Sequence, residues 1–319
     1  MSHFVKRTSP DRPLMIMMCG LPGSGKSTYA KDIYTIPKIG KPVIRSSDAL
    51  RAEMFGDEAT QGDNQKLFAE LHRRIKDDLR NGLDVIYDAT NIKKKTRIQF
   101  LKELSQIKCE PICIIMATTY ELCVENNLHR ERQVPEEVIK RMRMNWNPPH
   151  YSEGFSDIKY VFLPDNVNKY SIKSFFDFAN NFDQENNHHT LTLGEHCTKA
   201  SRYIQEKCPD NYNLLIAALL HDNGKLHTKT RLNSKGIDDG NCHYYQHHCV
   251  GAYNAMFCLN HEGFNEDAIT YISNLIYYHM HPLREWRQSG KSLRRDSDLL
   301  GEDMYNDIML LHEADVSAH

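Results

Sequence analysis

One nine-residue segment constrains the fold of this chain more than any other feature. Gly20-Leu-Pro-Gly-Ser-Gly-Lys-Ser-Thr28 matches G-x-x-x-x-G-K-[ST], follows an apolar run at 14–20 and precedes a helical pattern at 26–34. In that context the glycines let backbone N–H groups converge on phosphate oxygens at a helix N-terminus. We therefore expect a nucleotide-binding loop made of Gly20, Gly23, Ser24, Gly25, Lys26, Ser27 and Thr28.

Two residues of this loop carry the expected chemistry. Lys26 would act as a catalytic residue that reaches the β- and γ-phosphates of ATP or another nucleoside triphosphate, and Ser27 would ligate Mg²⁺. The loop predicts nucleotide binding but does not identify the acceptor of a transferred phosphate, which must be read from later residues.

Short apolar runs alternate with helical patterns through the first half of the chain. The runs lie at 14–20, 42–47, 84–90, 111–118 and 159–164, and helical patterns between them include 26–34, 62–81 and 96–107. This alternation predicts a parallel sheet covered by helices. A turn-rich stretch at 164–171 follows the last run, so we expect an α/β domain over residues 1–165.

Residues 166–319 show a different pattern. Apolar residues at three- and four-residue spacing predict helices at 193–207, 211–222, 246–260, 266–279 and 302–315, with no comparable series of strands. This half holds 14 Lys+Arg against 20 Asp+Glu and 13 of the 17 histidines. We expect an all-α domain, and its acidic, histidine-rich composition makes it a candidate for bound metal.

Composition narrows the class of protein further. The nine cysteines are scattered without a C-x-x-C pair, which favours reduced thiols over a disulfide framework or a zinc ribbon. No apolar run approaches the ~20 residues that span a bilayer, and the first residues lack the apolar core of a signal peptide. We expect a cytoplasmic protein without membrane association.

Polar residues follow the second apolar run. Asp48 and Arg51 lie in Ser46-Ser-Asp-Ala-Leu-Arg51, at the edge of a parallel sheet where ligands bind. Asp48 could accept a proton from an attacking hydroxyl, and Arg51, about one helical turn later, could hold an acceptor phosphate. The structural alternative is a helix N-cap formed by Ser47 or Asp48.

Two further segments extend this candidate site. Asp88-Ala-Thr-Asn91 ends the third run and is followed by the basic residues Lys93, Lys94, Lys95 and Arg97, of which the lysines are interpreted as a solvated charge run. Arg130 and Arg132 precede a predicted helix and could close as a lid over a transferring phosphoryl group. Ordinary surface arginines are the alternative.

The segments GLPGSGKST, SSDALR, VIYDATN and RER-VPEEVI, taken together, resemble the kinase domain of phage-type polynucleotide 5′-kinases over residues 13–165. The resemblance implies that Asp48 is the base for a 5′-hydroxyl and that Arg51 contacts the acceptor phosphate. It also implies acceptor-site support from Asp88, Thr90 and Asn91, and catalytic lid roles for Arg130 and Arg132. Kinases of small molecules or of aminoacyl-tRNA share the loop and the lid, so the acceptor stays open.

Histidines and aspartates form a second candidate site. His221-Asp222 ends an apolar helical segment, and the other candidates lie next to apolar helical residues, which predicts that they point inward. A single buried histidine is usually structural, but six uncompensated ionisable groups would be costly. The candidate metal ligands are His196, His221, Asp222, His247, His279 and Asp315.

The pieces LGEHCTKA, ALLHDNGK, YQHHCVGA, IYYHMHP and EADVSA resemble the HD phosphohydrolase superfamily over about residues 185–319. Asn223 stands where that superfamily usually has an aliphatic residue, and His248 and His281 could replace His247 and His279 as ligands. The resemblance implies Mn²⁺, Fe, Co²⁺, Ni²⁺ or Zn²⁺, with two ions as one arrangement. Lys225, as a catalytic residue, and His189 could contact a substrate phosphate.

A kinase fused to a phosphohydrolase is productive on a broken nucleic-acid strand. Ends with a 5′-hydroxyl and a 3′-phosphate or 2′,3′-cyclic phosphate need both reactions before a separate ligase can join them. The chain therefore resembles bifunctional end-healing enzymes that act on RNA or DNA ends. Two alternatives stay open: a small-molecule kinase fused to a nucleotidase or cyclic phosphodiesterase, and a nucleotide-binding HD-fold sensor.

Overall fold

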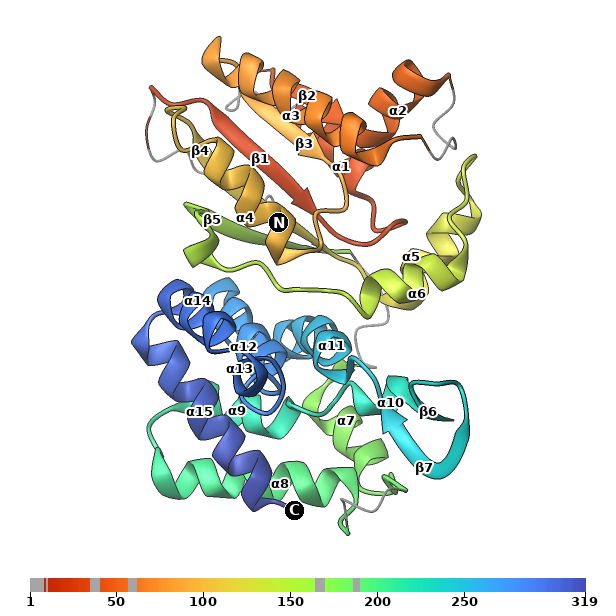
Figure 1. Ribbon diagram of the computed structural model, residues 1–319, viewed down its shortest axis with the longest axis vertical. Helices are drawn as coiled ribbons and strands as arrows, with labels where there is room; N and C mark the ends of the chain where they lie inside the picture. Colours follow the sequence, from red (N-terminus) through yellow and green to blue (C-terminus); the bar gives the residue numbers. More distant parts are fainter. Residues whose placement is uncertain (1–8, 10, 35–40, 57–61, 164–169, 186–189) are drawn as a thin grey trace. The chain divides into compact units, whose positions relative to one another are not determined.

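The computed structural model describes residues 9, 11–34, 41–56, 62–163, 170–185 and 190–319 (Figure 1). The chain forms two compact units. Unit 1 contains Met1–Met142 and Pro149–Asp165, and unit 2 contains Arg143–Pro148 and Asn166–His319. The sequence predicted a single boundary after residue 165. The division in the structure differs in one segment, because residues 143–148 belong to unit 2 although unit 1 continues after them. Most of the expected linker at 164–171 lies outside the described residues.

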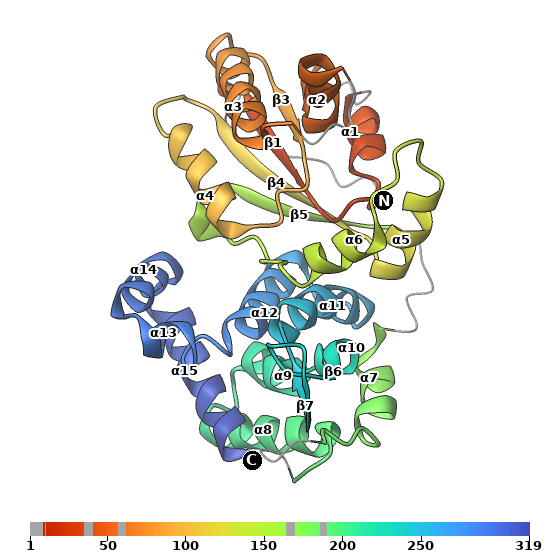
Figure 2. The ribbon, with the colours of Figure 1, turned by 45° about the vertical axis from the view of Figure 1, so that its right-hand side comes forward.

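Unit 1 is built on a five-stranded parallel sheet in the order β2-β3-β1-β4-β5 (Figures 1 and 2). The strands are β1 (Leu14–Cys19), β2 (Val43–Ser46), β3 (Val85–Asp88), β4 (Glu110–Ala117) and β5 (Asp157–Phe162). β1 is central and fully buried, with Ile16 opposite Ile86 on one side and Ile112 on the other. These strands confirm the parallel α/β fold that the five apolar runs predicted.

Helices connect the strands of unit 1. They are α1 (Lys26–Tyr34), α2 (Ser47–Phe55), α3 (Asn64–Arg80), α4 (Lys94–Glu103), α5 (Tyr120–Leu128), α6 (Glu136–Arg143) and the short η2 (Tyr151–Glu153). Leu14, Met18 and Ile114 belong to the apolar core beneath them. Because all five strands are parallel, their carboxyl ends share one edge, and the loops after β1, β2 and β3 meet there.

Unit 2 is mainly helical. It contains α7 (Ile172–Ala179), α8 (Leu193–Lys207), α9 (Tyr212–Leu220), α10 (Lys225–Thr228), α11 (His247–His261), α12 (Glu266–Tyr278), α13 (Glu285–Gln288), α14 (Gly290–Leu300) and α15 (Glu302–Ser317). α8, α9, α11, α12 and α15 pack against one another as a bundle (Figure 2). These five helices lie where the apolar spacing predicted them.

The expectation of a purely α-helical second half is wrong in one place. β6 (Lys229–Leu232) and β7 (Asp238–Tyr244) form an antiparallel hairpin between α10 and α11. Most of their residues are partly or fully exposed, so the segment lacks the alternation of apolar and polar residues that marks a half-buried strand. Gly236, with φ of 76°, allows the tight turn between them.

None of the nine cysteines, all of which lie in the described ranges, forms a disulfide bond, and seven of them are buried. No helix in the described part of the chain is long and apolar enough to cross a membrane.

Candidate functional site

The loop after β1 carries the seven predicted nucleotide-binding residues. The Lys26 amino group lies inside it and donates to the carbonyl oxygens of Gly20 and Leu21, at 3.1 and 2.7 Å. Burial lowers the pKa of Lys26, while the nearby Asp88 carboxylate opposes that shift. Gly23 has φ of 79°, and a Cβ there would collide with the carbonyl oxygen of Cys123, so the loop requires glycine at this position.

Asp88 lies against the loop rather than apart from it. One of its carboxylate oxygens accepts a hydrogen bond of 2.7 Å from the Ser27 hydroxyl. The contact follows from the sheet, because β3 pairs directly with β1 and Asp88 is the last residue of β3. A serine hydroxyl beside a carboxylate offers the oxygen ligands that Mg²⁺ prefers, so these two residues fit a magnesium ion that accompanies a nucleotide.

Thr90 and Asn91 hold the start of the same loop. The Gly20 N–H donates to the Thr90 carbonyl at 3.0 Å, and the Asn91 amide donates to the Met18 carbonyl at 2.9 Å. Asn91 has φ of 45°, a left-handed conformation that asparagine tolerates better than most residues. The resemblance to polynucleotide kinases implied acceptor support for Thr90 and Asn91, whereas these contacts join them to the phosphate-binding loop.

Arg97 differs from the lysines that precede it in the sequence. Lys93 and Lys95 are exposed, as expected of a solvated stretch, but Arg97 is only 1% exposed. Its guanidinium makes two bonds of 2.7 Å to the Glu153 carboxylate and one of 3.0 Å to the Asn91 carbonyl. Burial lowers the pKa of Arg97, but the Glu153 carboxylate outweighs it, so the arginine stays charged. Arg97 therefore supports the segment that holds the loop.

Asp48 meets the two lid arginines. The helix cap next to it is Ser46, so neither Ser47 nor Asp48 is used as the N-cap of α2. The Asp48 carboxylate instead accepts from Arg132 at 3.1 Å and from Arg130 at 3.5 Å. Asp48, the candidate base, therefore contacts both candidate lid arginines.

Arg51 lies on the same helix as Asp48, one turn further on, and is 9% exposed. One of its guanidinium nitrogens donates to the Asn64 side chain of α3 at 3.0 Å. This contact fixes the side chain between α2 and α3.

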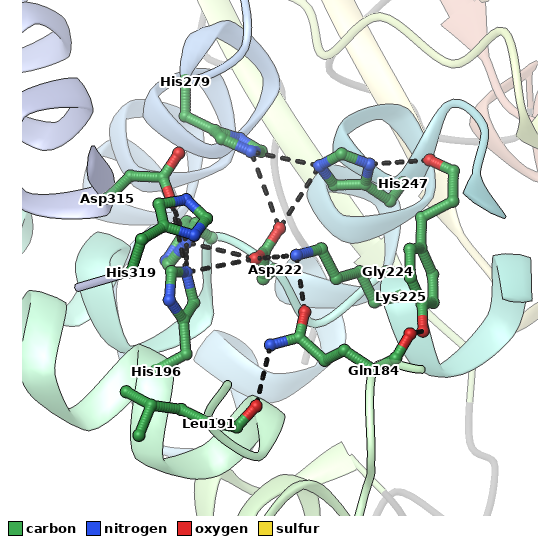
Figure 3. Close-up of polar contacts among 12 residues, drawn as sticks. Gln184, Leu191, His196, Asp222, Gly224, Lys225, His247, His279, Asp315 and His319 are labelled. Atoms are coloured by element: carbon green, nitrogen blue, oxygen red, sulfur yellow. Dashed lines mark hydrogen bonds and ion pairs between the residues drawn. The ribbon is translucent and has the colours of Figure 1, made fainter. Parts of the chain in front are cut away.

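The six predicted metal ligands converge in unit 2. Their donor atoms form two groups, and the atoms of each group lie within 4.8 Å of one another. Asp222 belongs to both groups (Figure 3). The first group is His196, His221, Asp222 and Asp315, and the second is Asp222, His247 and His279. We refer to these six residues as the His/Asp cluster.

The two oxygens of Asp222 face different groups. Oδ2 lies 3.4 Å from Nε2 of both His196 and His221, whereas Oδ1 lies 3.2 Å from Nε2 of His247. Oδ1 is also 3.8 Å from Nε2 of His279. A carboxylate with one oxygen directed at each group has the arrangement needed to bridge two ions.

Three histidines direct Nε2 to the centre of the cluster. Nδ1 of His221, His247 and His279 lies 2.8, 2.8 and 2.6 Å from the backbone carbonyl three residues earlier. A carbonyl only accepts hydrogen bonds, so each Nδ1 carries a proton and Nε2 is the atom left for the cluster. Burial lowers the pKa of His279 to about 3, which keeps it neutral. Burial also lowers the pKa of His221, but the Asp222 carboxylate outweighs it and holds that pKa well above its usual range.

In two pairs of histidines, the Nε2 atoms face each other at hydrogen-bonding distance. His247 and His279 have their Nε2 atoms 3.2 Å apart, and His196 and His221 show the same separation. Two acceptors at this distance repel unless a proton or a cation lies between them. Imidazole nitrogens with carboxylate oxygens form a donor set that transition metals favour, so the cluster fits divalent metal without selecting one element.

Close packing explains how the chain places this cluster. His221 ends α9, and the turn after it passes so near α11 that a Cβ on Gly224 would collide with the His247 carbonyl. Asn223, the departure from the superfamily pattern, donates to the carbonyls of Leu220 at 2.7 Å and Gly251 at 3.1 Å. The polar residue at this position therefore ties the end of α9 to α11.

Lys225 is buried beside Asp222. Its amino group lies 2.7 Å from Asp222 Oδ2 and 2.8 Å from the Gln184 side-chain oxygen. Burial raises the pKa of the Asp222 carboxyl, but Lys225 and His221 outweigh it and hold the pKa well below its usual range. Gln184 is fully buried, and the sequence offered no signal for it because a lone glutamine in a polar stretch matches no pattern.

Three further histidines were candidates from the sequence. His248 and His281 are buried but belong to neither donor group; their rings lie 6.1 Å apart, and the His248 ring is 6.4 Å from that of His279. The alternative ligands considered from sequence thus lie beside the cluster. His189 lies outside the described residues.

The protein-family comparison matches residues that form most of unit 1. A protein-family model described as an AAA domain matches residues 15–149. L-seryl-tRNA(Sec) kinase of Methanococcus maripaludis is 28% identical over 144 residues, which are 43% of this chain and 53% of that enzyme. The match thus spans about half the length of this curated relative.

Solved structures give weaker likenesses. A chain of the Pnkp1/Rnl/Hen1 RNA repair complex is 20% identical with a TM-score of 0.35, covering 44% of this chain and 45% of that one. A fungal RNA kinase is 14% identical with a TM-score of 0.37, covering 48% and 76%. The family match, the parallel sheet and the loop after β1 together show that unit 1 is a P-loop kinase-like domain.

Proposed function

We propose that this protein heals the ends of broken RNA or DNA strands. One chain carries a nucleotide-binding loop with a candidate base for a hydroxyl acceptor, and separately a cluster of six metal-ligand residues. The observation that carries the proposal is the shared position of Asp222 in both donor groups, because a bridged two-ion site is suited to phosphoester hydrolysis. A strand break with a 5′-hydroxyl and a 3′-phosphate needs both a 5′-kinase and a 3′-phosphatase before a ligase can join its ends.

In the kinase reaction, each residue of unit 1 has a distinct task. The loop and Lys26 hold the phosphates of the nucleoside triphosphate, and Ser27 with Asp88 would hold its Mg²⁺, which neutralises charge on the transferred group. Asp48 accepts the proton of the 5′-hydroxyl, and Arg51 binds the neighbouring acceptor phosphate. For Asp48 to act, Arg130 and Arg132 must leave it, and the incoming phosphates are the anions that would draw them away.

The curated relative supports the kinase part of the proposal. It is named as a kinase of L-seryl-tRNA(Sec), so its named substrate contains RNA. The Asp48–Arg51 pair and the two lid arginines supply what a hydroxyl next to a phosphate requires, namely a base and cations for the phosphate.

In the hydrolase reaction, the His/Asp cluster would hold one or two divalent ions. Such ions activate water and stabilise the oxygen that leaves a phosphoester. Lys225 contacts Asp222 Oδ2 at 2.7 Å and would offer a positive charge to a substrate phosphate. We propose 3′-phosphate and 2′,3′-cyclic phosphate ends as the substrates, with a separate ligase acting afterwards on the healed strand.

One experiment tests the acceptor. The protein is incubated with γ-labelled ATP and a 5′-hydroxyl oligonucleotide, as wild type and as Lys26→Ala, Asp48→Asn and Asp63→Asn variants. We expect label transfer by the wild type, and a loss of about 10²-fold or more in the Lys26 and Asp48 variants. Asp63→Asn is the matched control, because Asp63 caps α3 with its side chain and asparagine caps equally well. Transfer to free nucleosides but not to the oligonucleotide would contradict the proposal.

A crossed pair of variants tests the two reactions separately. Asp222→Ala should abolish phosphate release from an oligonucleotide with a 3′-phosphate or 2′,3′-cyclic phosphate and spare 5′-kinase activity. Lys26→Ala should do the reverse. Loss of kinase activity in a folded Asp222→Ala protein, or full phosphatase activity after metal removal, would refute the two-site assignment.

A further inference from the structure

Unit 2 carries a concentrated group of positive charges in an otherwise acidic half of the chain. Residues 284–295 hold five of the 14 Lys+Arg residues of 166–319, and the rest of that half holds 9 against 19 Asp+Glu. All five side chains are exposed. They are Arg284, Arg287, Lys291, Arg294 and Arg295, and we refer to them as the basic cluster.

A buried contact fixes the two helices that carry these residues. The indole N–H of Trp286 in α13 donates to the Asp296 carboxylate in α14 at 3.1 Å, and both side chains are buried. Their sequence neighbours Arg287 and Arg295 are exposed. On α14, Lys291 lies three and four residues before Arg294 and Arg295, so these three side chains share one face of the helix.

Most of these positive side chains are not held in ion pairs. Arg295 pairs with Asp296 at 3.2 Å. Within the ranges that the structure describes, Arg284, Arg287, Lys291 and Arg294 form no ion pair. Four unpaired cations on two adjoining helices make a surface that attracts a polyanion.

The basic cluster begins at the edge of the His/Asp cluster. His281 follows the candidate ligand His279 by two residues, and its carbonyl accepts the backbone N–H groups of Arg284 at 3.2 Å and Trp286 at 2.9 Å. The His281 ring also lies near His248, which in turn neighbours His279. From there α13 leads into α14, which packs against α15 (Figures 1 and 2).

We propose that the basic cluster binds the phosphate backbone of the polynucleotide strand whose 3′ end enters the His/Asp cluster. The inference rests on the proposed hydrolase function and adds the surface that selects a strand over a mononucleotide. A mononucleotide needs cations only beside the metal ligands. The positive charges continue into the first half of α14, where Lys291, Arg294 and Arg295 span about 6 Å of the helix axis, nearly twice the ~3.4 Å rise between nucleotides in one strand.

The first test measures binding and uses no activity. The full-length protein is titrated into a fluorescein-labelled single-stranded oligonucleotide, with a chelator present and salt varied from about 50 to 200 mM. The Arg287→Gln/Arg294→Gln variant removes two contacts, so the slope of log K against log salt should become shallower by about 1.4, at about 0.7 per phosphate contact. Arg202→Gln, an exposed arginine of α8, is the matched control and should leave the slope unchanged.

The second test compares substrates. In the double variant, the KM for 3′-phosphate release from an oligonucleotide should rise several-fold, while the KM for a 2′,3′-cyclic mononucleotide should stay as in the wild type. A slope unchanged from wild type, or equal losses on both substrates, would overturn the proposal. If the wild type releases phosphate from neither substrate, the hydrolase function fails, and the salt slope alone still decides whether the basic cluster binds a strand.

Discussion

Arg97 and Glu153 form a buried, two-pronged ion pair between α4 and η2, with both side chains 0% exposed. The two residues are 56 positions apart in the sequence, which makes this a long-range contact. The third contact of the guanidinium, to the Asn91 carbonyl, connects the pair to the residues that hold the phosphate-binding loop. Stability and nucleotide binding are therefore linked through one arginine.

Glu153→Gln should destabilise unit 1 and weaken nucleotide binding. The substitution leaves the Arg97 charge buried without its partner, which costs about 3 kcal/mol or more in free energy of unfolding. Urea unfolding read by hydrogen exchange in β1 and β4 peptides, together with the KM for ATP, checks both effects. Glu53→Gln is the control, because Glu53 pairs with Arg74 at the surface and should change neither quantity.

A double variant separates the two effects. Arg97→Met/Glu153→Leu replaces the ion pair with apolar side chains and should recover most of the lost stability. It cannot recover the bond to the Asn91 carbonyl, so the KM for ATP should stay raised. A wild-type KM in the double variant would show that Arg97 does not position the loop.

Single substitutions in the His/Asp cluster should differ in metal stoichiometry. His247→Ala removes a ligand from one donor group, so bound metal should fall from two ions per chain to one. Asp222→Ala affects both groups and should leave almost none. Metal content by mass spectrometry checks this, with His243→Gln as the control because His243 bonds to Asp239 on the hairpin. Equal loss in the His247 and Asp222 variants would contradict separate groups.

Trp146→Ala should destabilise unit 2, although Trp146 precedes the end of unit 1 in the sequence. Its ring is fully buried and meets the Tyr253 ring of α11 edge-on at 5.2 Å. Emptying this space should cost about 3–5 kcal/mol, measured as faster hydrogen exchange in α11 peptides during urea titration. Trp146→Phe should lose much less. Unchanged exchange in α11 after the alanine substitution would show that residue 146 does not support unit 2.

Unit 1 should lose stability in mild acid through His72. Burial lowers the pKa of His72 to about 4, with Glu103 opposing the shift, whereas an exposed histidine titrates near 6.5. The unfolded chain binds the proton more readily, so this stability is complete above about pH 6.5 and declines as the pH falls toward 4. His72→Gln should flatten the decline in urea unfolding of unit 1 over that range, and the exposed His129→Gln should not. An unaltered decline in His72→Gln would assign it to other groups.

Local patterns were sufficient for the sheet and for the convergence of the candidate ligands. β1, β3 and β4 are short, mainly apolar runs that are buried almost throughout, and burial of such runs on both faces leaves few alternatives to a parallel sheet. His196 lies in the amphipathic α8 and His279 follows the amphipathic α12, where the apolar neighbours indicate which way the side chain points. His247 begins α11, which is buried on all sides over its first 13 residues. These features depend on a few residues close together in sequence.

Contacts between residues far apart in the sequence could not be predicted from local patterns. Arg97 stands in a basic stretch, and nothing nearby indicates that its partner is Glu153. Gln184 meets Lys225 for the same kind of reason, through contacts 41 residues apart. The β6–β7 hairpin was missed because an exposed hairpin buries too little apolar surface to impose a pattern on its sequence.

The excursion of residues 143–148 affects the order in which the protein can form during synthesis. A ribosome releases this segment before β5, the strand that completes the sheet of unit 1, and well before α11, which the segment packs against. The Trp146 ring therefore lacks its packing partner in α11 while more than 100 further residues are synthesised. Only when α11 has been synthesised can the Trp146 ring pack against Tyr253.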